Sequence, residues 1–317
     1  MRVVFWGTPE FATPPLRALV GEGHEVVGVV TQPDRPRKQG GRSRSALDPS
    51  PVKVVALEEG IPVLQPDRPR GDEFVAALRA LWPDVSVVVA YGHILPKEVI
   101  DLPRLGTLNI HASLLPLYRG AAPIQAAIRH GHSETGVSIM RMVPQLDAGP
   151  VILTLRTDIL ADETGGELQL RLAELGAQGI IEALALLDLG GVLEQPQDDS
   201  RATYAKKITR DDARVDWTAS ADEVERAIRA YDPKPGAWTT RADLEVRVFG
   251  AKVAPTLAPL PSEGPGVVLA ADDDGLVVAC GRGSVRLQEV HPAGKKRQPA
   301  AAWARGRGVA VGDILGE

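Results

Sequence analysis

The run at residues 85–89, V-S-V-V-V, constrains the fold more than any other feature of the sequence. A short stretch made almost entirely of valine is typical of a central strand in a parallel sheet, buried on both faces. Similar apolar runs recur through the first half of the chain and alternate with segments whose apolar residues follow helical spacing. This alternation predicts a doubly wound, mostly parallel α/β sheet, which binds its ligands beyond the carboxyl ends of the strands.

The second half of the chain has a different pattern. Short strand-like runs follow one another closely and are separated by Gly, Pro and Asp, which predicts a small β-barrel. A chain of 317 residues is long enough for two domains. We therefore expect an α/β domain at residues 1–193, a surface linker at 194–210 and a C-terminal β-barrel at 211–317.

Composition excludes several classes of protein. No apolar run reaches the roughly 20 residues needed to span a bilayer, and the N-terminus lacks the pattern of a signal peptide. A single cysteine, Cys280, excludes an internal disulfide framework and fits a reducing compartment. The 6 histidines lack the spacing of a metal site, so no metal is expected. We expect a cytoplasmic monomer that does not bind membranes.

Three polar residues are placed where such a sheet binds ligands. Asn109 and His111 stand two apart on a predicted strand, so their side chains share one face. Asp147 lies in a loop directly before another strand-like run. An amide can donate to a developing oxyanion, and a carboxylate can orient an imidazole, which suits acyl transfer without a protein nucleophile. Taken singly, each residue is more often a cap or a turn former.

The surrounding motifs resemble a known family. The sequence N-I-H-A-S-L-L-P-L-Y-R-G-A-A-P at 109–123, T-G-V-S at 135–138 and D-A-G-P at 147–150 resemble the signature of folate-dependent formyltransferases. The resemblance implies a formyltransferase-type α/β domain and assigns Asn109, His111 and Asp147 to the catalytic set. It further implies folate contacts from the S-L-L-P loop and a pteridine-side wall from V-A-Y-G: Ser113, Leu114, Leu115, Pro116, Val89, Ala90, Tyr91 and Gly92.

Other motifs resemble the members of this family that act on charged tRNA. These are F-W-G-T-P-E-F-A at 5–12, T-Q-P-D-R-P at 31–36, S-P-V-K at 50–53, Y-A-K-K-I-T at 204–209, D-D-A-R-V-D-W at 211–217 and R-A-Y-D-P-K-P-G-A-W at 229–238. The resemblance implies transfer of a formyl group from 10-formyltetrahydrofolate, a reduced folate, to the α-amino group of charged methionyl-initiator tRNA. The loop after Pro36 is longer than the usual family pattern.

Two basic segments stand out in a chain whose net charge is -5. Five lysines and arginines lie within residues 35–44, and seven lie within 282–307 against one acid, Glu289. Such contrasts are typical of a surface that binds a phosphate backbone, although a charge run is often only solvated surface. We predict tRNA contacts from Arg35, Arg37, Lys38, Arg42, Arg44, Lys206, Lys207, Arg282, Lys295, Lys296 and Arg297.

Three alternatives remain. A dinucleotide-binding dehydrogenase is disfavoured because residues 7–10, G-T-P-E, lack the spaced glycines of the phosphate fingerprint. A formyltransferase acting on a small amine or a sugar nucleotide would share much of the first half. A nucleic-acid-binding module that keeps the fold without the chemistry would share the basic segments.

Overall fold

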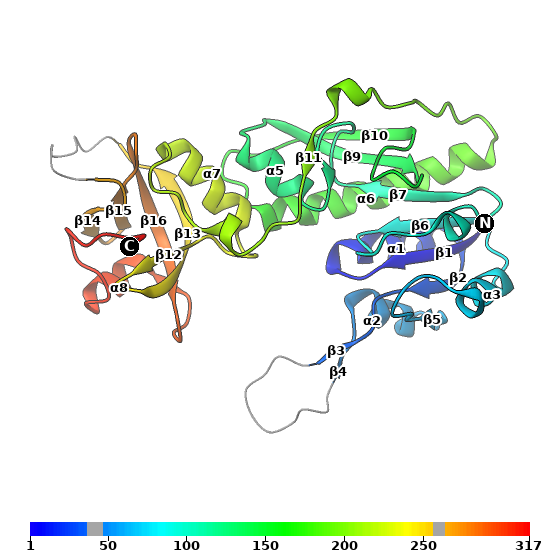
Figure 1. Cartoon of the computed structure of the whole chain (residues 1–317), viewed down its shortest axis with the longest axis horizontal. Helices are drawn as coiled ribbons and strands as arrows, with labels where there is room; N and C mark the ends of the chain where they lie inside the picture. The colour runs from blue at the N-terminus through cyan, green and yellow to red at the C-terminus, as the bar shows by residue number, and fades with distance from the viewer. Residues whose placement is uncertain (37–46, 256–263) are drawn as a thin grey trace. The chain divides into compact units, whose positions relative to one another are not determined.

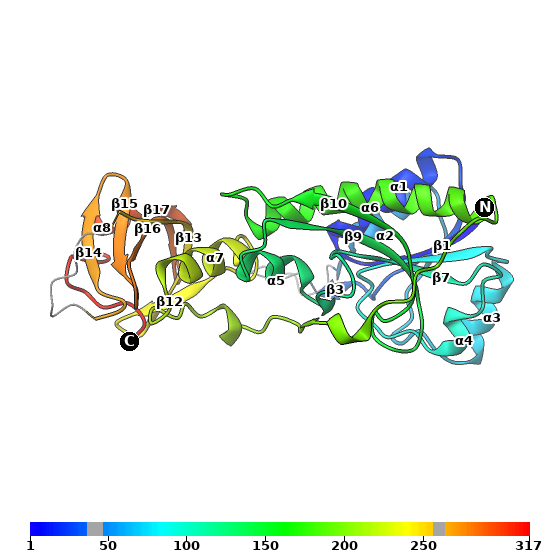
Figure 2. The same ribbon diagram turned by 90° about the horizontal axis from the view of Figure 1, so that it is seen from above.

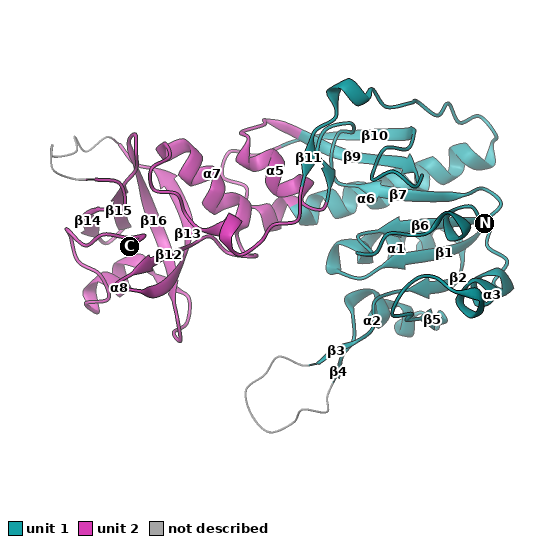
Figure 3. Ribbon diagram, in the orientation of Figure 1, with its two compact units in different colours: residues 1–120, 135–158, 169–205 teal, residues 121–134, 159–168, 206–317 magenta. Residues whose placement is uncertain are grey.

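The computed structural model of the chain describes residues 1–36, 47–255 and 264–317. These residues form two compact units (Figure 3). Unit 1 contains 1–120, 135–158 and 169–205, and unit 2 contains 121–134, 159–168 and 206–317, apart from the undescribed residues. Two segments from within the predicted first domain thus belong to unit 2, and the predicted linker is divided between the units. The predicted domain boundaries stay a prediction.

Unit 1 is built on a seven-stranded sheet with the order β10-β9-β7-β6-β1-β2-β5 (Figure 1). The strands are β1 (Arg2–Gly7), β2 (Glu25–Val30), β5 (Val63–Leu64), β6 (Val85–Val89), β7 (Thr107–His111), β9 (Glu134–Arg141) and β10 (Val151–Asp158). The pairs from β7 to β5 are parallel, whereas β7 and β9 are antiparallel. Because β1 lies between β2 and β6, the strand order reverses there, which is where such sheets bind ligands.

Helices cover both faces of this sheet. They are α1 (Thr13–Gly21), α2 (Pro51–Glu58), α3 (Asp72–Ala80), α4 (Lys97–Ile100) and α6 (Gly165–Asp188), with α1 and α6 on one side and α3 and α4 on the other (Figure 2). The packing of α6 on Ile110 and Ile139 is close: a Cβ on Gly176 would lie 2.8 Å from Ile110. Since side chains alternate along a strand, the neighbours of Ile110 in β7 face away from α6.

Four short elements connect loops of unit 1. The two-residue strands β3 (Arg35–Pro36) and β4 (Leu47–Asp48) form an antiparallel pair, and β8 (Arg119–Gly120) pairs in parallel with β11 (Tyr204–Ala205). Two 3₁₀ turns, η1 (Glu10–Ala12) and η2 (Asp199–Arg201), also belong to this unit. The pairing of β11 with β8 attaches the second half of the predicted linker to a loop that follows β7.

Unit 2 contains a six-stranded sheet whose pairs are antiparallel, with the order β12-β13-β16-β15-β14 and β17 beside β16. The elements are α5 (Pro123–Arg129), η3 (Asp211–Ala213), α7 (Ala221–Tyr231), β12 (Trp238–Arg241), β13 (Leu244–Val253), β14 (Val268–Asp272), β15 (Gly275–Ala279), β16 (Ser284–Pro292), β17 (Gln298–Pro299) and α8 (Ala300–Arg305). A capping box between Ser220 and Glu223 starts α7, and its residues Val224 and Ile228 are buried in the core of the unit.

The predicted fold class is confirmed: a mostly parallel α/β sheet is followed by an antiparallel β unit. The run at 85–89 forms β6, every residue of which is buried. Among the described helices, none is long and apolar enough to cross a membrane.

Candidate active site

His111 is the buried centre of the predicted catalytic set. It ends β7 and is 6% exposed. Its Nε2 lies 2.9 Å from the carbonyl oxygen of Tyr118. Because a carbonyl oxygen only accepts hydrogen bonds, Nε2 carries a proton, and in the neutral ring Nδ1 is left without one. Nδ1 is therefore the nitrogen that can take up or release a proton.

Asp147 faces this nitrogen. Its Oδ2 lies 3.7 Å from His111 Nδ1, which is an electrostatic contact rather than a hydrogen bond. The same oxygen accepts a hydrogen bond of 2.7 Å from the backbone N–H of Gly120. Catalytic contacts commonly tighten only when substrate is bound. The structure thus brings His111 and Asp147 together as the sequence predicts.

Asn109 is two residues before His111 on β7 and is half-buried. Strand register aligns it with Val88 of β6, which is aligned with Trp6 of β1. It therefore shares the sheet face of those residues, opposite to α6. Its amide forms no hydrogen bond with any residue in the described part of the chain. An amide that is held on a strand but has no internal partner can donate to a ligand.

The S-L-L-P loop is held by two serines. Ser113 Oγ donates to the carbonyl oxygen of Leu117 at 2.6 Å. Ser138 Oγ donates to the carbonyl oxygen of Ser113 at 2.7 Å and accepts from the backbone N–H of Leu115 at 3.1 Å. Ser113 is buried, whereas Leu114, Leu115 and Pro116 are half-buried. The Ser113 hydroxyl thus fixes the loop, and the next three side chains remain for contact with a ligand.

The V-A-Y-G segment ends β6 at the switch point of the sheet. The side chains of Val89 and Tyr91 are 0% and 1% exposed, whereas Ala90 and Gly92 are exposed. Both exposed residues have positive φ, 48° and 88°. Burial raises the pKa of Tyr91 to about 12, so its phenol stays neutral. A ligand at this wall would meet Ala90, Gly92 and the backbone.

The T-Q-P-D-R-P and S-P-V-K motifs meet in one polar network. Lys53 Nζ donates to Asp34 at 2.6 Å and to Gln65 at 2.7 Å. Gln65 Nε2 in turn donates to Asp34 at 2.8 Å and to the carbonyl oxygen of Gln32 at 2.9 Å. Gln32 Nε2 donates to the carbonyl oxygen of Tyr91 at 2.9 Å. The network therefore joins the base of the basic loop to the V-A-Y-G segment.

Of the predicted basic residues in the loop after β2, only Arg35 is described. It is exposed, and its Nη2 donates to Gln32 at 2.9 Å. Arg37, Lys38, Arg42 and Arg44 lie outside the described residues.

The basic residues of unit 2 differ in whether carboxylates pair with their side chains. Lys206, Lys207, Arg282, Lys295 and Lys296 are exposed, although Lys206 Nζ lies 3.9 Å from the carboxylate of Asp212. Arg297 instead pairs with Glu289, lies 3.4 Å from Asp232 and stacks 4.0 Å above the Phe249 ring. Two further arginines of the segment are also paired, Arg286 with Asp272 and Arg305 with Asp273. Acids distant in sequence thus neutralise part of the charge that the linear count predicts.

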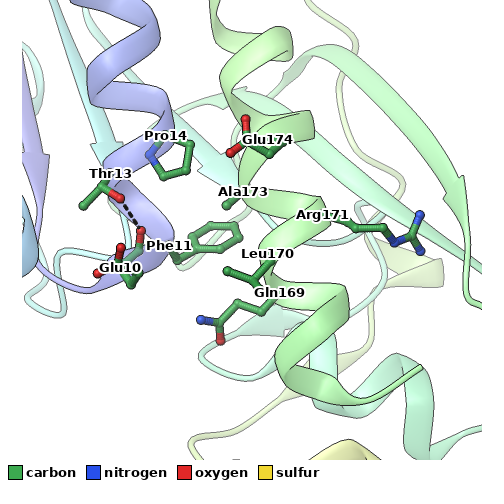
Figure 4. A pocket seen from close by; sticks show the side chains of 9 residues that line it. All are labelled: Glu10, Phe11, Thr13, Pro14, Gln169, Leu170, Arg171, Ala173 and Glu174. Atoms are coloured by element: carbon green, nitrogen blue, oxygen red, sulfur yellow. Dashed lines mark hydrogen bonds between the residues drawn. The ribbon is translucent and has the colours of Figure 1, made fainter. Parts of the chain in front are cut away.

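A cavity of about 430 Å³ lies between η1, α1 and α6 (Figure 4). Phe11, Leu170 and Ala173 line its apolar side, and Glu10, Arg171 and Glu174 add charged groups. It lies on the α6 side of the sheet, opposite Asn109, and is therefore separate from the candidate site. Within the described ranges no group of three or more His, Cys, Asp or Glu side chains is placed to hold a metal ion.

The fold and the candidate site are those of an α/β group-transfer enzyme, with an amide and an imidazole on β7 and a carboxylate that faces the imidazole. The chain belongs to the formyl transferase family: residues 1–184 match its formyl transferase domain and residues 207–308 its C-terminal domain. It is 47% identical to the methionyl-tRNA formyltransferase of Pseudomonas syringae pv. tomato, over 100% of this chain and 99% of that protein. It is 49% identical to that of Methylococcus capsulatus, with 95% of both chains covered.

Solved structures with the same fold have lower identity. Methionyl-tRNA formyltransferase from Clostridium thermocellum is 13% identical, with a TM-score of 0.55 over 80% of this chain and 94% of that one. HypX from Aquifex aeolicus in complex with tetrahydrofolic acid is 21% identical, with a TM-score of 0.66 over 95% of this chain. The chain spans 46% of the length of HypX. At these identities the likeness shows the fold alone.

The Lys53–Asp34–Gln65 network generates a prediction about acid stability. Hydrogen bonds from Lys53 and Gln65 lower the pKa of Asp34, so its ionised form stabilises the folded chain above the unfolded value of about 3.9. This stabilisation is lost as the pH falls through the lowered pKa. We expect Asp34→Asn to be less stable than the parent at pH 7 and the difference to shrink towards pH 3, measured by urea unfolding. Glu58→Gln, which removes an exposed ion pair with Arg17, is the control; a difference for Asp34→Asn that does not vary with pH would contradict the assignment.

Proposed function

We propose that the chain transfers the formyl group of 10-formyltetrahydrofolate to the α-amino group of methionyl-initiator tRNA, as a cytoplasmic enzyme of translation initiation. The observation that carries the chemistry is that Asn109 and His111 share one face of β7 while the Asp147 carboxylate lies 3.7 Å from His111 Nδ1. The tRNA substrate is supported by the methionyl-tRNA formyltransferases that match the whole chain at about 47% identity.

Asn109 is proposed to stabilise the oxyanion. When the amine nitrogen attacks the formyl carbon, a C–N bond forms and the carbonyl electron pair moves to oxygen. The free amide of Asn109, fixed on β7 at the edge of the site, is suited to donate to this oxygen. One such donor, aimed at charge that develops only in the transition state, is worth several kcal/mol, roughly 3–4.

His111 and Asp147 are proposed to manage the proton. The attacking nitrogen must lose a proton, and the folate nitrogen N10 must gain one as its bond to the formyl carbon breaks. Nδ1 of His111 can accept the first proton because Nε2 is committed to Tyr118. The imidazolium that results faces the Asp147 carboxylate, which stabilises its charge until the proton passes to N10.

The folate is proposed to lie between the S-L-L-P loop and the V-A-Y-G segment, with Leu114, Leu115, Pro116, Ala90 and Gly92 nearest to it. The tRNA contacts are proposed from the exposed basic residues and from the four that lie outside the described range.

Formyl transfer from labelled 10-formyltetrahydrofolate tests the function, with charged initiator tRNA, uncharged tRNA and small amines as acceptors. Transfer to the small amines alone would contradict the proposal.

Asn109→Ala should fold normally but lose about 100- to 1000-fold in kcat, as when one oxyanion donor is removed. The exposed amide of Gln145 is a control, because Gln145→Ala deletes a loop amide outside the site. Single-turnover rates at saturating donor give the comparison. If Asn109→Ala retains kcat within threefold of the parent, Asn109 is not an oxyanion donor.

Asp147→Asn should be nearly inactive while keeping the loop, because an amide oxygen can still accept from the Gly120 N–H. The parent should show an ionisation in the pH profile of kcat/KM that the variant lacks, since the carboxylate no longer faces His111. The pH profiles of both proteins measure this. An active variant with the profile of the parent would make Asp147 structural.

The free and the paired cations of unit 2 should differ in tRNA binding. Lys295→Ser and Lys296→Ser should each flatten the salt dependence of binding by about one unit of slope. Arg297→Ser should flatten it less, because two carboxylates already face Arg297. Binding measured across a salt series decides between them. Equal slopes for all three variants and the parent would show that these charges contact no phosphate.

A further inference from the structure

The structure assigns a positioning role to Gln197, which lies in the predicted linker and outside every motif of the family resemblance. We propose that its side-chain amide holds the D-A-G-P loop in the conformation that aims the carboxylate of Asp147 at His111. The inference deepens the proposed function and rests on it, because it concerns the same catalytic pair.

The amide of Gln197 connects two loops of the site. Its Nε2 donates to the carbonyl oxygens of Asp147 at 2.8 Å and Gly149 at 2.7 Å. Its Oε1 accepts from Nε and Nη2 of Arg119 at 3.1 and 2.9 Å. Two carbonyl oxygens can only accept and a guanidinium can only donate, so the orientation of the amide is fixed.

The loop needs such a support because its backbone is unfavourable. Asp147 has a φ of 47°, in the left-handed region that residues other than glycine rarely adopt. The backbone of Gly149 lies so close to Arg141 that a Cβ built on Gly149 would be 1.8 Å from the carbonyl oxygen of Arg141. The two hydrogen bonds from Gln197 fall on the first and third residues of this loop, and so stabilise the turn that presents the carboxylate.

Arg119 gives Gln197 a fixed anchor. Arg119 is 3% exposed and also donates to Asp199 at 2.7 Å. Burial lowers its pKa, but hydrogen bonds with Asp199 and Tyr204 outweigh this and leave the pKa raised. The guanidinium therefore stays charged and keeps its geometry against the Gln197 oxygen.

The loop of Arg119 is itself the loop that holds His111. Tyr118 accepts from His111, and Gly120 donates to Asp147. Thr203 accepts from the backbone N–H groups of Tyr118 and Arg119, each at 2.8 Å. Residues 197–203 thus bind both the loop that contacts His111 and the loop that carries Asp147. A shift of Gln197 would change the separation of the catalytic pair.

The substitution Gln197→Glu tests this positioning role and leaves no cavity, because the two side chains have nearly the same volume. The carboxylate can still pair with Arg119, but it cannot donate to the two carbonyl oxygens unless it is protonated. We expect kcat to fall about 10- to 100-fold near neutral pH, the scale of a small misplacement of a catalytic group. The KM values for donor and tRNA should stay within about twofold, and part of the lost kcat relative to the parent should return at lower pH. Gln195→Glu adds the same charge two residues away on an exposed side chain and should match the parent.

An NMR measurement on the protein without substrate tests the role of Gln197 independently of the proposed function. The amide proton of Gly120 reports its hydrogen bond to Asp147, so its NMR chemical shift should move in Gln197→Glu and not in Gln195→Glu. A parent-like Gly120 shift together with parent-like kcat and pH profile would overturn the positioning role. Lower stability with unchanged kcat of the folded protein would overturn it as well. If the parent itself fails to formylate charged tRNA, the proposed function fails, and the Gly120 shift still decides the role of Gln197.

Discussion

The hydrogen bond from the Gly120 N–H to the Asp147 carboxylate, 2.7 Å long, is the contact on which the candidate site depends. It joins the loop after β7 to the loop before β10. Without it, the longer contact to His111 at 3.7 Å would be the one that remains to the Asp147 carboxylate among the described residues. Gly120 is suited to this place because its φ is 113° and a Cβ would lie 2.6 Å from the carbonyl oxygen of Ala205. A residue without a side chain therefore lets β11 pair with β8 at this position.

The fold could be predicted largely because local pattern and burial agree in this chain. The valine run at residues 85–89 is typical of a strand buried on both faces, and it forms β6. The two-residue spacing of Asn109 and His111 predicted that their side chains share one face of a strand, and both residues do lie on β7. The participation of residues 121–134 and 159–168 in unit 2 could not be predicted, since it depends on packing between segments far apart in sequence.

The arrangement of the candidate site was predictable where a motif is contiguous and not where folding brings distant residues together. Asn109, His111 and Asp147 stand in recognisable runs. Gln197 stands in a polar stretch that resembles any solvated linker, and only its contacts with Arg119 and the D-A-G-P loop distinguish it. Arg119 carried a weak signal, a charge within an otherwise apolar run. The count of charges along the sequence was the least reliable guide to a phosphate-binding surface. Three acids outside the basic segment pair with its arginines: Asp232, Asp272 and Asp273.

We propose that an amide, an imidazole and a carboxylate surround the formyl group while the protein supplies no nucleophile. A crystal structure with a stable 10-formyl folate analogue tests this most directly. We expect the formyl oxygen to lie about 2.7–3.1 Å from the Asn109 amide nitrogen, with the formyl carbon open to an amine on the side of His111. A formyl oxygen bound by other donors, with the Asn109 amide turned away from it, would contradict the account.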